Sequence, residues 1–146
     1  SVSFSYLCNI IYKFLSMKKI LFSLLLTMAT IGAWSANKPA KVYMFGFASS
    51  FNDSTVCFTD IQTVDSAYID SKTKFLYSRE NYSYQLRDYL KEKGFITPTC
   101  ITIFTLKRKD IEKRLAKMRK RYSNGKYIVK DIKSPEFTYQ AVKFEE

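Results

Sequence analysis

Residues 41–62 read KVYMFGFASSFNDSTVCFTDIQ and hold two β-rich runs joined by a polar connection. The runs, Lys41–Phe47 and Thr55–Gln62, are rich in the aromatic and β-branched residues that favour strands. The connection between them contains Asn52 and Asp53, whose side chains favour turns. The stretch therefore predicts an antiparallel hairpin with a long loop.

Two amphipathic helices are predicted further along the chain. In Asn81–Lys93 the apolar side chains recur at helical spacing, and Gly94 suits a left-handed helix stop. The second helix is predicted over Asp110–Tyr122. Its core stripe consists of Ile111, Leu115, Met118 and Tyr122.

Further strands are predicted on either side of the second helix. Cys100–Leu106 reads CITIFTL, which is short, β-branched and uncharged, as expected of a central strand buried on both faces. Tyr127–Ile132 is another strand, and Phe137–Phe144 is consistent with one more edge strand. Val64–Lys74 is ambiguous between sheet and loop.

The resulting order is β-β-α-β-α-β, with or without a final strand, which is typical of an α+β protein. We expect a two-layer sandwich in which both helices pack on one face of a mixed, four- to five-stranded sheet. Residues 36–146 form a single small domain in this interpretation. A chain of that length buries on the order of 65% of its unfolded surface.

The stretch before this domain has the parts of a secretory signal. Lys18 and Lys19 form a positive start, Ile20–Ile31 is apolar, and Ala33-Trp34-Ser35 allows cleavage before Ala36. We therefore expect residues 17–35 to be a signal peptide of a bacterial type, and the domain to reach the periplasm, the outer surface or the medium. An uncleaved N-terminal membrane anchor is the alternative. Residues 1–16 are expected to be an over-extended reading frame, with translation starting at Met17.

Positive charge is concentrated in one segment. Residues 107–121 hold nine Lys or Arg and two acidic residues, a net charge of +7, in a chain of net charge +11. On a helix, four of the lysines form a row opposite the core stripe, and the arginines lie on the flanks. The residues predicted to bind an anion are Lys109, Lys113, Lys117, Lys120, Arg114 and Arg121. The alternative is a solvated helix face that only keeps the domain soluble.

The partner expected for this face is an anionic surface, either envelope lipid or acidic polysaccharide. A nucleic acid is not expected, because the sequence contains no nucleic-acid-binding motif. Two aromatic residues are further candidates for partner contact: Phe51 in a predicted loop and Tyr84, which points away from the apolar face of its helix. Phe51 is equally consistent with a small satellite core.

Catalytic signatures are weak. Histidine is absent, which removes His-based acid–base catalysis and His-ligated metal sites. Asp60, Asp65 and Asp70 recur at intervals of five, a spacing that neither a strand nor a helix brings to one point. No catalytic residue, metal site or cofactor is therefore predicted.

The function expected is that of an exported, non-catalytic binding module. One alternative is a small hydrolase that uses carboxylates or Tyr, and another is a structural subunit that assembles through an edge strand. Cys57 and Cys100 are candidates for a disulfide, with two unpaired buried thiols as the alternative.

Overall fold

The computed structural model describes residues 2–28 and 36–145. The chain divides into two compact units, residues 1–35 and 36–146. The first unit contains α1 (Val2–Met28). Within the described residues, no helix has both the length and the apolar content needed to cross a bilayer. The predicted cleavage site at Ala33-Trp34-Ser35 lies outside the described residues, so the export signal stays a prediction.

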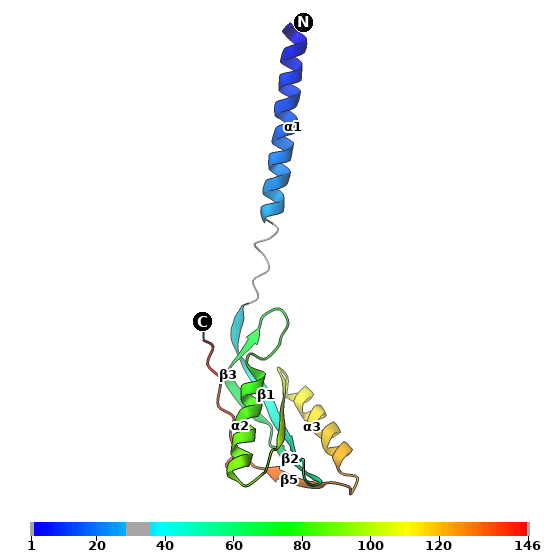
Figure 1. Ribbon diagram of the computed structural model, residues 1–146, viewed down its shortest axis with the longest axis vertical. Coiled ribbons are helices and arrows are strands. Elements are labelled where there is room, and N and C mark those ends of the chain that lie inside the picture. Colours follow the sequence, from blue (N-terminus) through cyan, green and yellow to red (C-terminus); the bar gives the residue numbers. More distant parts are fainter. Residues whose placement is uncertain (1, 29–35, 146) are drawn as a thin grey trace. The chain divides into compact units, whose positions relative to one another are not determined.

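The second unit combines a five-stranded sheet with two helices (Figure 1). Its elements in chain order are β1 (Asn37–Ser49), β2 (Thr55–Thr59), β3 (Gln62–Asp70), α2 (Arg79–Glu92), β4 (Thr99–Thr105), α3 (Arg108–Tyr122) and β5 (Ile128–Ile132). The α+β class and the mixed sheet are confirmed. The predicted chain order is also correct, with β3 as an additional strand in the segment that the sequence leaves ambiguous.

β1 is the long central strand of the sheet. It pairs antiparallel with β2, β3 and β4. Phe47, Ala48 and Ser49 pair with both β2 and β4, so these two strands lie on opposite sides of β1. β2 and β3 follow one another along the chain, and β5 pairs parallel with β2. The predicted antiparallel hairpin is therefore present, with β1 and β2 as its arms.

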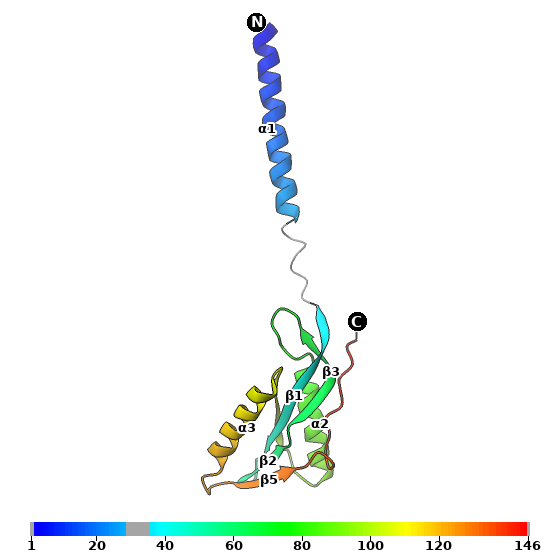
Figure 2. The same ribbon diagram turned by 180° about the vertical axis from the view of Figure 1, so that it is seen from behind.

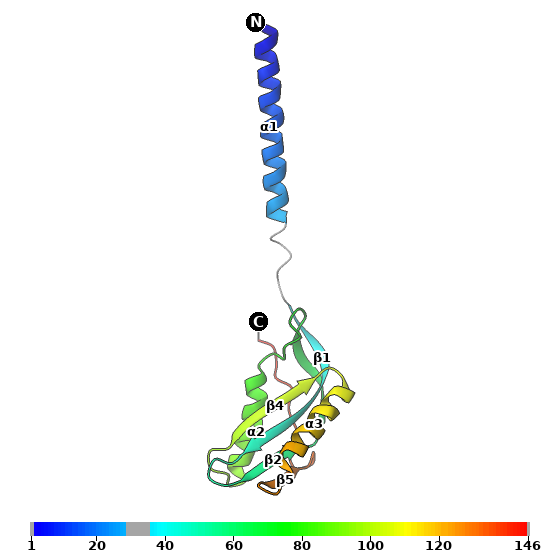
Figure 3. The same cartoon turned by 90° about the vertical axis from the view of Figure 1, so that its right-hand side faces the viewer.

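The two faces of the sheet carry separate cores, because successive side chains of β1 point to opposite faces. Val42 and Met44 pack in one cluster with Leu86 of α2. Phe45 packs in a second cluster with Ile111 of α3. The helices therefore cover opposite faces, as the views from behind and from the side show (Figures 2 and 3).

This arrangement corrects the expectation that both helices share one face. β1 is apolar on both of its faces, and each face needs its own cover to be removed from water. The unit thus has three layers, with the sheet in the middle. Both clusters consist of residues from this unit, so it contains a core of its own.

β4 is an edge strand and not the central strand predicted from its apolar sequence. Among the strands of the described sheet, it pairs only with β1. Thr102 is fully buried, whereas Ile101 is 41% exposed. An uncharged strand can lie at an edge here because β4 packs against both α2 and α3, which lie on opposite faces of the sheet.

The C-terminal segment is not assigned as a strand, which differs from the edge strand predicted over Phe137–Phe144. Two glutamine side chains bind its backbone in place of a neighbouring strand. Gln62 donates to the carbonyl of Phe137 at 2.9 Å and accepts from the N–H of Tyr139 at 2.7 Å. Gln85 binds both backbone groups of Gln140, at 2.9 and 2.8 Å. The segment is thereby held on the α2 face of the sheet, where Phe137 and Tyr139 join the core.

Candidate anion-binding surface

The apolar stripe of α3 docks the helix on the sheet in the predicted way. Ile111 is fully buried, and the other stripe residues pack partly buried against the same cluster. Tyr122 lies with its ring centroid 4.9 Å from that of Phe47. Burying a side chain such as Ile111 contributes roughly 2 kcal/mol to stability. The stripe fixes which residues of α3 face solvent.

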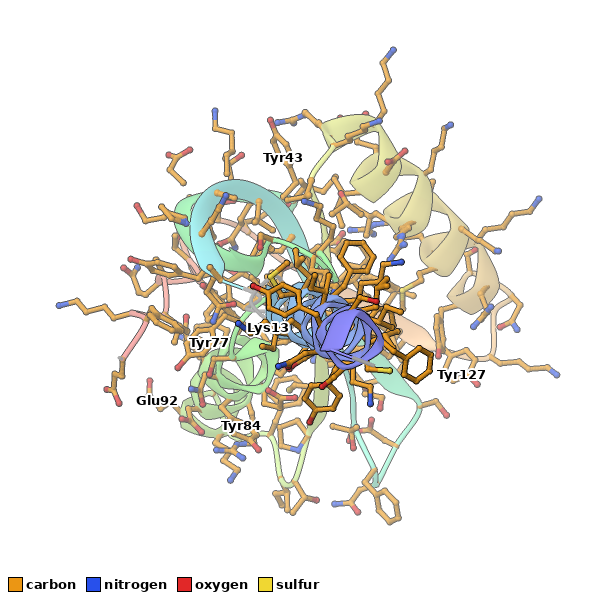
Figure 4. The ribbon with its side chains drawn as sticks, turned by 90° about the horizontal axis from the view of Figure 1, so that it is seen from above. Lys13, Tyr43, Tyr77, Tyr84, Glu92 and Tyr127 are labelled. Atoms are coloured by element: carbon orange, nitrogen blue, oxygen red, sulfur yellow. The ribbon has the colours of Figure 1, made fainter. Side chains whose placement is uncertain are left out.

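The outward face of α3 carries a set of exposed cations, as predicted. The lysine row is defined as Lys109, Lys113, Lys117 and Lys120, and all four are exposed. Arg114 and Arg121 are also exposed. Figure 4 shows nitrogen-tipped side chains that project outward from the α3 ribbon. None of these six cations forms an ion pair with a carboxylate of the described residues.

Two other arginines of α3 are paired and differ from these six. Arg108 donates to Glu112 at 3.0 Å, and Arg119 forms an ion pair with Asp131 of β5. At about 100° per residue, these paired groups fall on one flank of the helix, whereas Arg114 falls on the opposite flank. The unpaired charge of α3 is therefore directed to the outer face and one flank.

The helix dipole of α3 interacts with the cations near its two ends. The first turn begins after Lys107, which makes no side-chain cap hydrogen bond. The last turn contains Arg119, Lys120 and Arg121. Cations at a helix C-terminus interact favourably with the helix dipole, while like charges four residues apart destabilise a helix by a few tenths of a kcal/mol each. The repulsion among the four lysines of the row therefore lowers the stability of α3, and the helix dipole offsets part of this loss at Lys120.

A hollow of about 430 Å³ lies beside the start of α3. It is formed by the loop before α2, the end of β4 and the first turns of α3. Its lining residues are Thr73, Lys74, Phe75, Arg79, Phe104, Thr105, Leu106, Lys107, Asp110 and Arg114. We call this the α3 hollow. It combines four cations with one carboxylate and several apolar side chains.

Sequence reasoning missed the α3 hollow because its lining comes from three separate segments. Lys107 and Arg114 belong to the recognised basic segment, but Lys74 ends the ambiguous segment and Phe75 follows it. Residues 72–75 read KTKF and place two lysines next to an aromatic residue. This local pattern does not indicate which part of the protein packs beside Phe75.

Neither of the two aromatic candidates is on α3. Phe51 is 85% exposed in the turn between β1 and β2, which excludes a satellite core. Tyr84 is on α2, and the Arg87 guanidinium lies over its ring at 4.4 Å. Figure 4 shows Tyr84 well apart from Tyr127, which follows α3 in the chain. The structure therefore does not bring Phe51, Tyr84 and the lysine row into one site.

Of the two alternatives for Cys57 and Cys100, the structure shows free thiols and not a disulfide. Cys57 and Cys100 each lie opposite Ala48, one on either side of β1. Two inter-strand spacings separate their Cα atoms by roughly 10 Å, beyond the limit of about 7 Å for a bridge. Burial raises the pKa of the Cys57 thiol, and it raises the pKa of Cys100 to about 11.

The three regularly spaced carboxylates have separate structural roles. Asp60 accepts from the N–H of Ser134 at 3.0 Å, and Asp65 lies 3.7 Å from the ammonium of Lys41. Asp70 accepts from the N–H groups of the turn that comes after it. Among the residues that the structure describes, no three Cys, Asp or Glu side chains gather in a way that could hold a metal ion.

Comparison with protein-family models, with curated proteins and with solved structures gives no match for this chain. The functional interpretation of the chain therefore rests on the geometry of α3 and its surroundings.

Proposed function

We propose that this protein is a non-catalytic binding module that uses the outer face of α3 to hold an anionic surface. The observation that carries the proposal is the set of six exposed Lys and Arg residues that lack a carboxylate partner in the described structure. The partner classes are envelope lipid and acidic polysaccharide. Both present rows of negative charge that match a row of cations on a helix.

A polyanion is expected to bind this face because the lysines of the row repel one another. Lys109, Lys113 and Lys117 succeed one another at i,i+4, which places like charges side by side on the helix surface. A polyanion laid along the row replaces this repulsion with attraction. Binding of this kind falls as salt rises, because the screening length is about 8 Å at physiological ionic strength.

Export is part of the proposal. It rests on the signal-like residues 17–35, where two lysines precede an apolar run and small residues flank a cleavage position. A protein in the periplasm or outside the cell meets lipid headgroups and acidic polysaccharides rather than chromosomal DNA. The export signal therefore agrees with lipid and polysaccharide as the partner classes.

The proposal is tested by replacing the lysine row in the second unit, residues 36–146. The variant combines Lys109→Gln, Lys113→Gln, Lys117→Gln and Lys120→Gln. Each lysine near an anionic membrane contributes up to about 1 kcal/mol, so the four substitutions should weaken binding to phosphatidylglycerol vesicles on the order of a hundredfold. Cosedimentation with the vesicles measures this loss, and a heparin column measures the corresponding loss with a polysaccharide.

A matched control removes the same charge elsewhere. Lys38, Lys91, Lys93 and Lys143 are exposed and lie outside both α3 and the α3 hollow. Changing these four to Gln should lower affinity much less than the row variant, although both proteins have the same net charge. Equal losses in the two variants would contradict the proposal, because binding would then depend on net charge alone. Thermal melts check that the row variant keeps or slightly raises its stability.

One of the alternative functions also has a specific observation in its favour. β4 has an open edge on the side away from β1 in the described sheet, and its Ile101 is 41% exposed. An uncharged edge strand favours pairing with another chain. This supports assembly through β4 as the second candidate, although Arg79 limits it by donating to the carbonyl of Thr102 on that edge. The hydrolase alternative gains no such support, since Asp60, Asp65 and Asp70 are engaged in separate contacts.

A further inference from the structure

We propose that the anionic partner is a phospholipid bilayer, and that the α3 hollow is where the domain enters its headgroup layer. This inference rests on the proposed function and narrows its partner from two classes to one. In this arrangement, cations of the hollow bind lipid phosphates, while Phe75 and Leu106 at the hollow insert among the acyl chains.

The charges of the hollow favour a phosphate. Lys74, Lys107 and Arg114 line it, and none of them pairs with a carboxylate of the described residues. Two of the four cations also donate to backbone carbonyls: the Lys74 ammonium to Ser71 at 2.7 Å and the Arg79 Nε to Thr102 at 2.8 Å. With the single carboxylate of the lining, the hollow has a formal net charge of +3.

The apolar side chains of the hollow distinguish a bilayer from a polysaccharide. Phe75 is 70% exposed and Leu106 is 42% exposed, and both line the same hollow as the cations. Large apolar side chains next to lysines are the pattern by which proteins lie in a membrane interface. A heparin-like chain offers no apolar layer for Leu106, so only a bilayer uses both sets of residues.

The loop that presents Phe75 is held in place by hydrogen bonds. The side chain of Asp70 accepts from the N–H groups of Lys72 at 2.9 Å and Thr73 at 2.6 Å. The N–H of Asp70 donates to the carbonyl of Phe75 at 2.9 Å, which closes the turn. Lys74 takes a positive φ of 62° within it. A closed turn loses little conformational entropy when its tip inserts into lipid.

The hollow is continuous with the unpaired face of α3. Arg114 lines the hollow and lies on the flank of α3 that has no ion pairs in the described structure, next to the lysine row. A bilayer in contact with Phe75 and Leu106 therefore meets the free cations of the same flank. Phe51, the most exposed of the described aromatic residues, lies beyond the opposite end of β1 and serves as a control.

The test uses the second unit and vesicles of phosphatidylcholine with or without phosphatidylglycerol. We expect Phe75→Ser with Leu106→Ser to lower affinity for the anionic vesicles about tenfold, and to leave heparin binding unchanged. Phe51→Ser should leave both affinities unchanged. A single tryptophan introduced as Phe75→Trp should shift its emission to shorter wavelength when anionic vesicles are added, whereas Phe51→Trp should not.

The outcomes separate this inference from the proposed function. If the lysine-row variant loses vesicle binding while the Phe75 and Leu106 variant keeps it, the inference is wrong and the proposed function stands. If the lysine-row variant keeps its binding, the proposed function itself is wrong. An unchanged emission of Phe75→Trp in vesicles that the protein demonstrably binds also overturns the insertion.

Discussion

At the scale of single residues, Gly46 shows how tightly the α2 face of the sheet is packed. A Cβ atom at this position would lie 2.5 Å from Leu86 Cδ2 and would also overlap the Tyr139 hydroxyl. The Gly46 N–H donates to Thr59 Oγ1 at 2.7 Å, and the Tyr139 hydroxyl lies 3.2 Å from Thr102 Oγ1. Burial raises the pKa of Tyr139 well above its ordinary value, so this phenol stays protonated and structural.

The two cysteines give a residue-scale prediction. Denatured, unreduced residues 36–146 should contain two reactive thiols, because Cys57 and Cys100 lie on opposite sides of β1. In the folded protein, alkylation at pH 8 should be slow, since burial raises both pKa values and the thiolate is the reacting form. The rate at Cys100 should rise as the pH approaches its pKa of about 11. Fewer than two thiols in the denatured protein would show that a bridge forms.

At the scale of elements, Arg79 protects the open edge of β4. Thr102 lies opposite Gly46, whose N–H points to the β2 side, so the carbonyl of Thr102 faces away from β1. Arg79 of α2 donates to this carbonyl at 2.8 Å and thereby occupies an acceptor that a second strand needs. Covering or charging an edge in this way limits pairing with other chains.

We therefore predict that Arg79→Leu increases self-association. The variant frees the Thr102 carbonyl in the middle of an uncharged strand, and sedimentation velocity should show a larger share of dimer than in the parent protein. Arg87→Leu is the matched control, because Arg87 is also on α2 but stacks on Tyr84 and binds Asp88. A parent-like monomer fraction in both variants would contradict a protective role of Arg79.

At the scale of the whole molecule, the sequence predicts elements better than their arrangement. Helical spacing correctly places the stripe from Ile111 to Tyr122, and β-rich runs correctly place the hairpin. The faces are harder to predict, because KVYMFGF is apolar at nearly every position and does not indicate that two helices share its two sides. CITIFTL is mistaken for a central strand for the same reason, since a strand covered by helices is apolar at an edge as well.

In the candidate site too, the sequence predicts what lies within one element but not what depends on the packing of several elements. The lysine row results from the period of one helix, so the sequence predicts it residue by residue. The α3 hollow depends on the turn at Lys74 and Phe75 meeting the start of α3, which is a tertiary contact without a local pattern. The sequence leaves Cys57 and Cys100 open between a disulfide and two free thiols for a related reason, because strand order decides the distance between them.

The most direct test of the central claim is a lysine footprint of the second unit by mass spectrometry. Acetylation rates are measured with vesicles that contain phosphatidylglycerol and with phosphatidylcholine vesicles as the reference. The account predicts that the anionic vesicles slow acetylation several-fold at Lys113, Lys117 and Lys120. It predicts unchanged rates at Lys91 and Lys143, because these two lysines lie outside both α3 and the α3 hollow. The account would be contradicted if the anionic vesicles slowed acetylation equally at all five lysines, or only at Lys91 and Lys143.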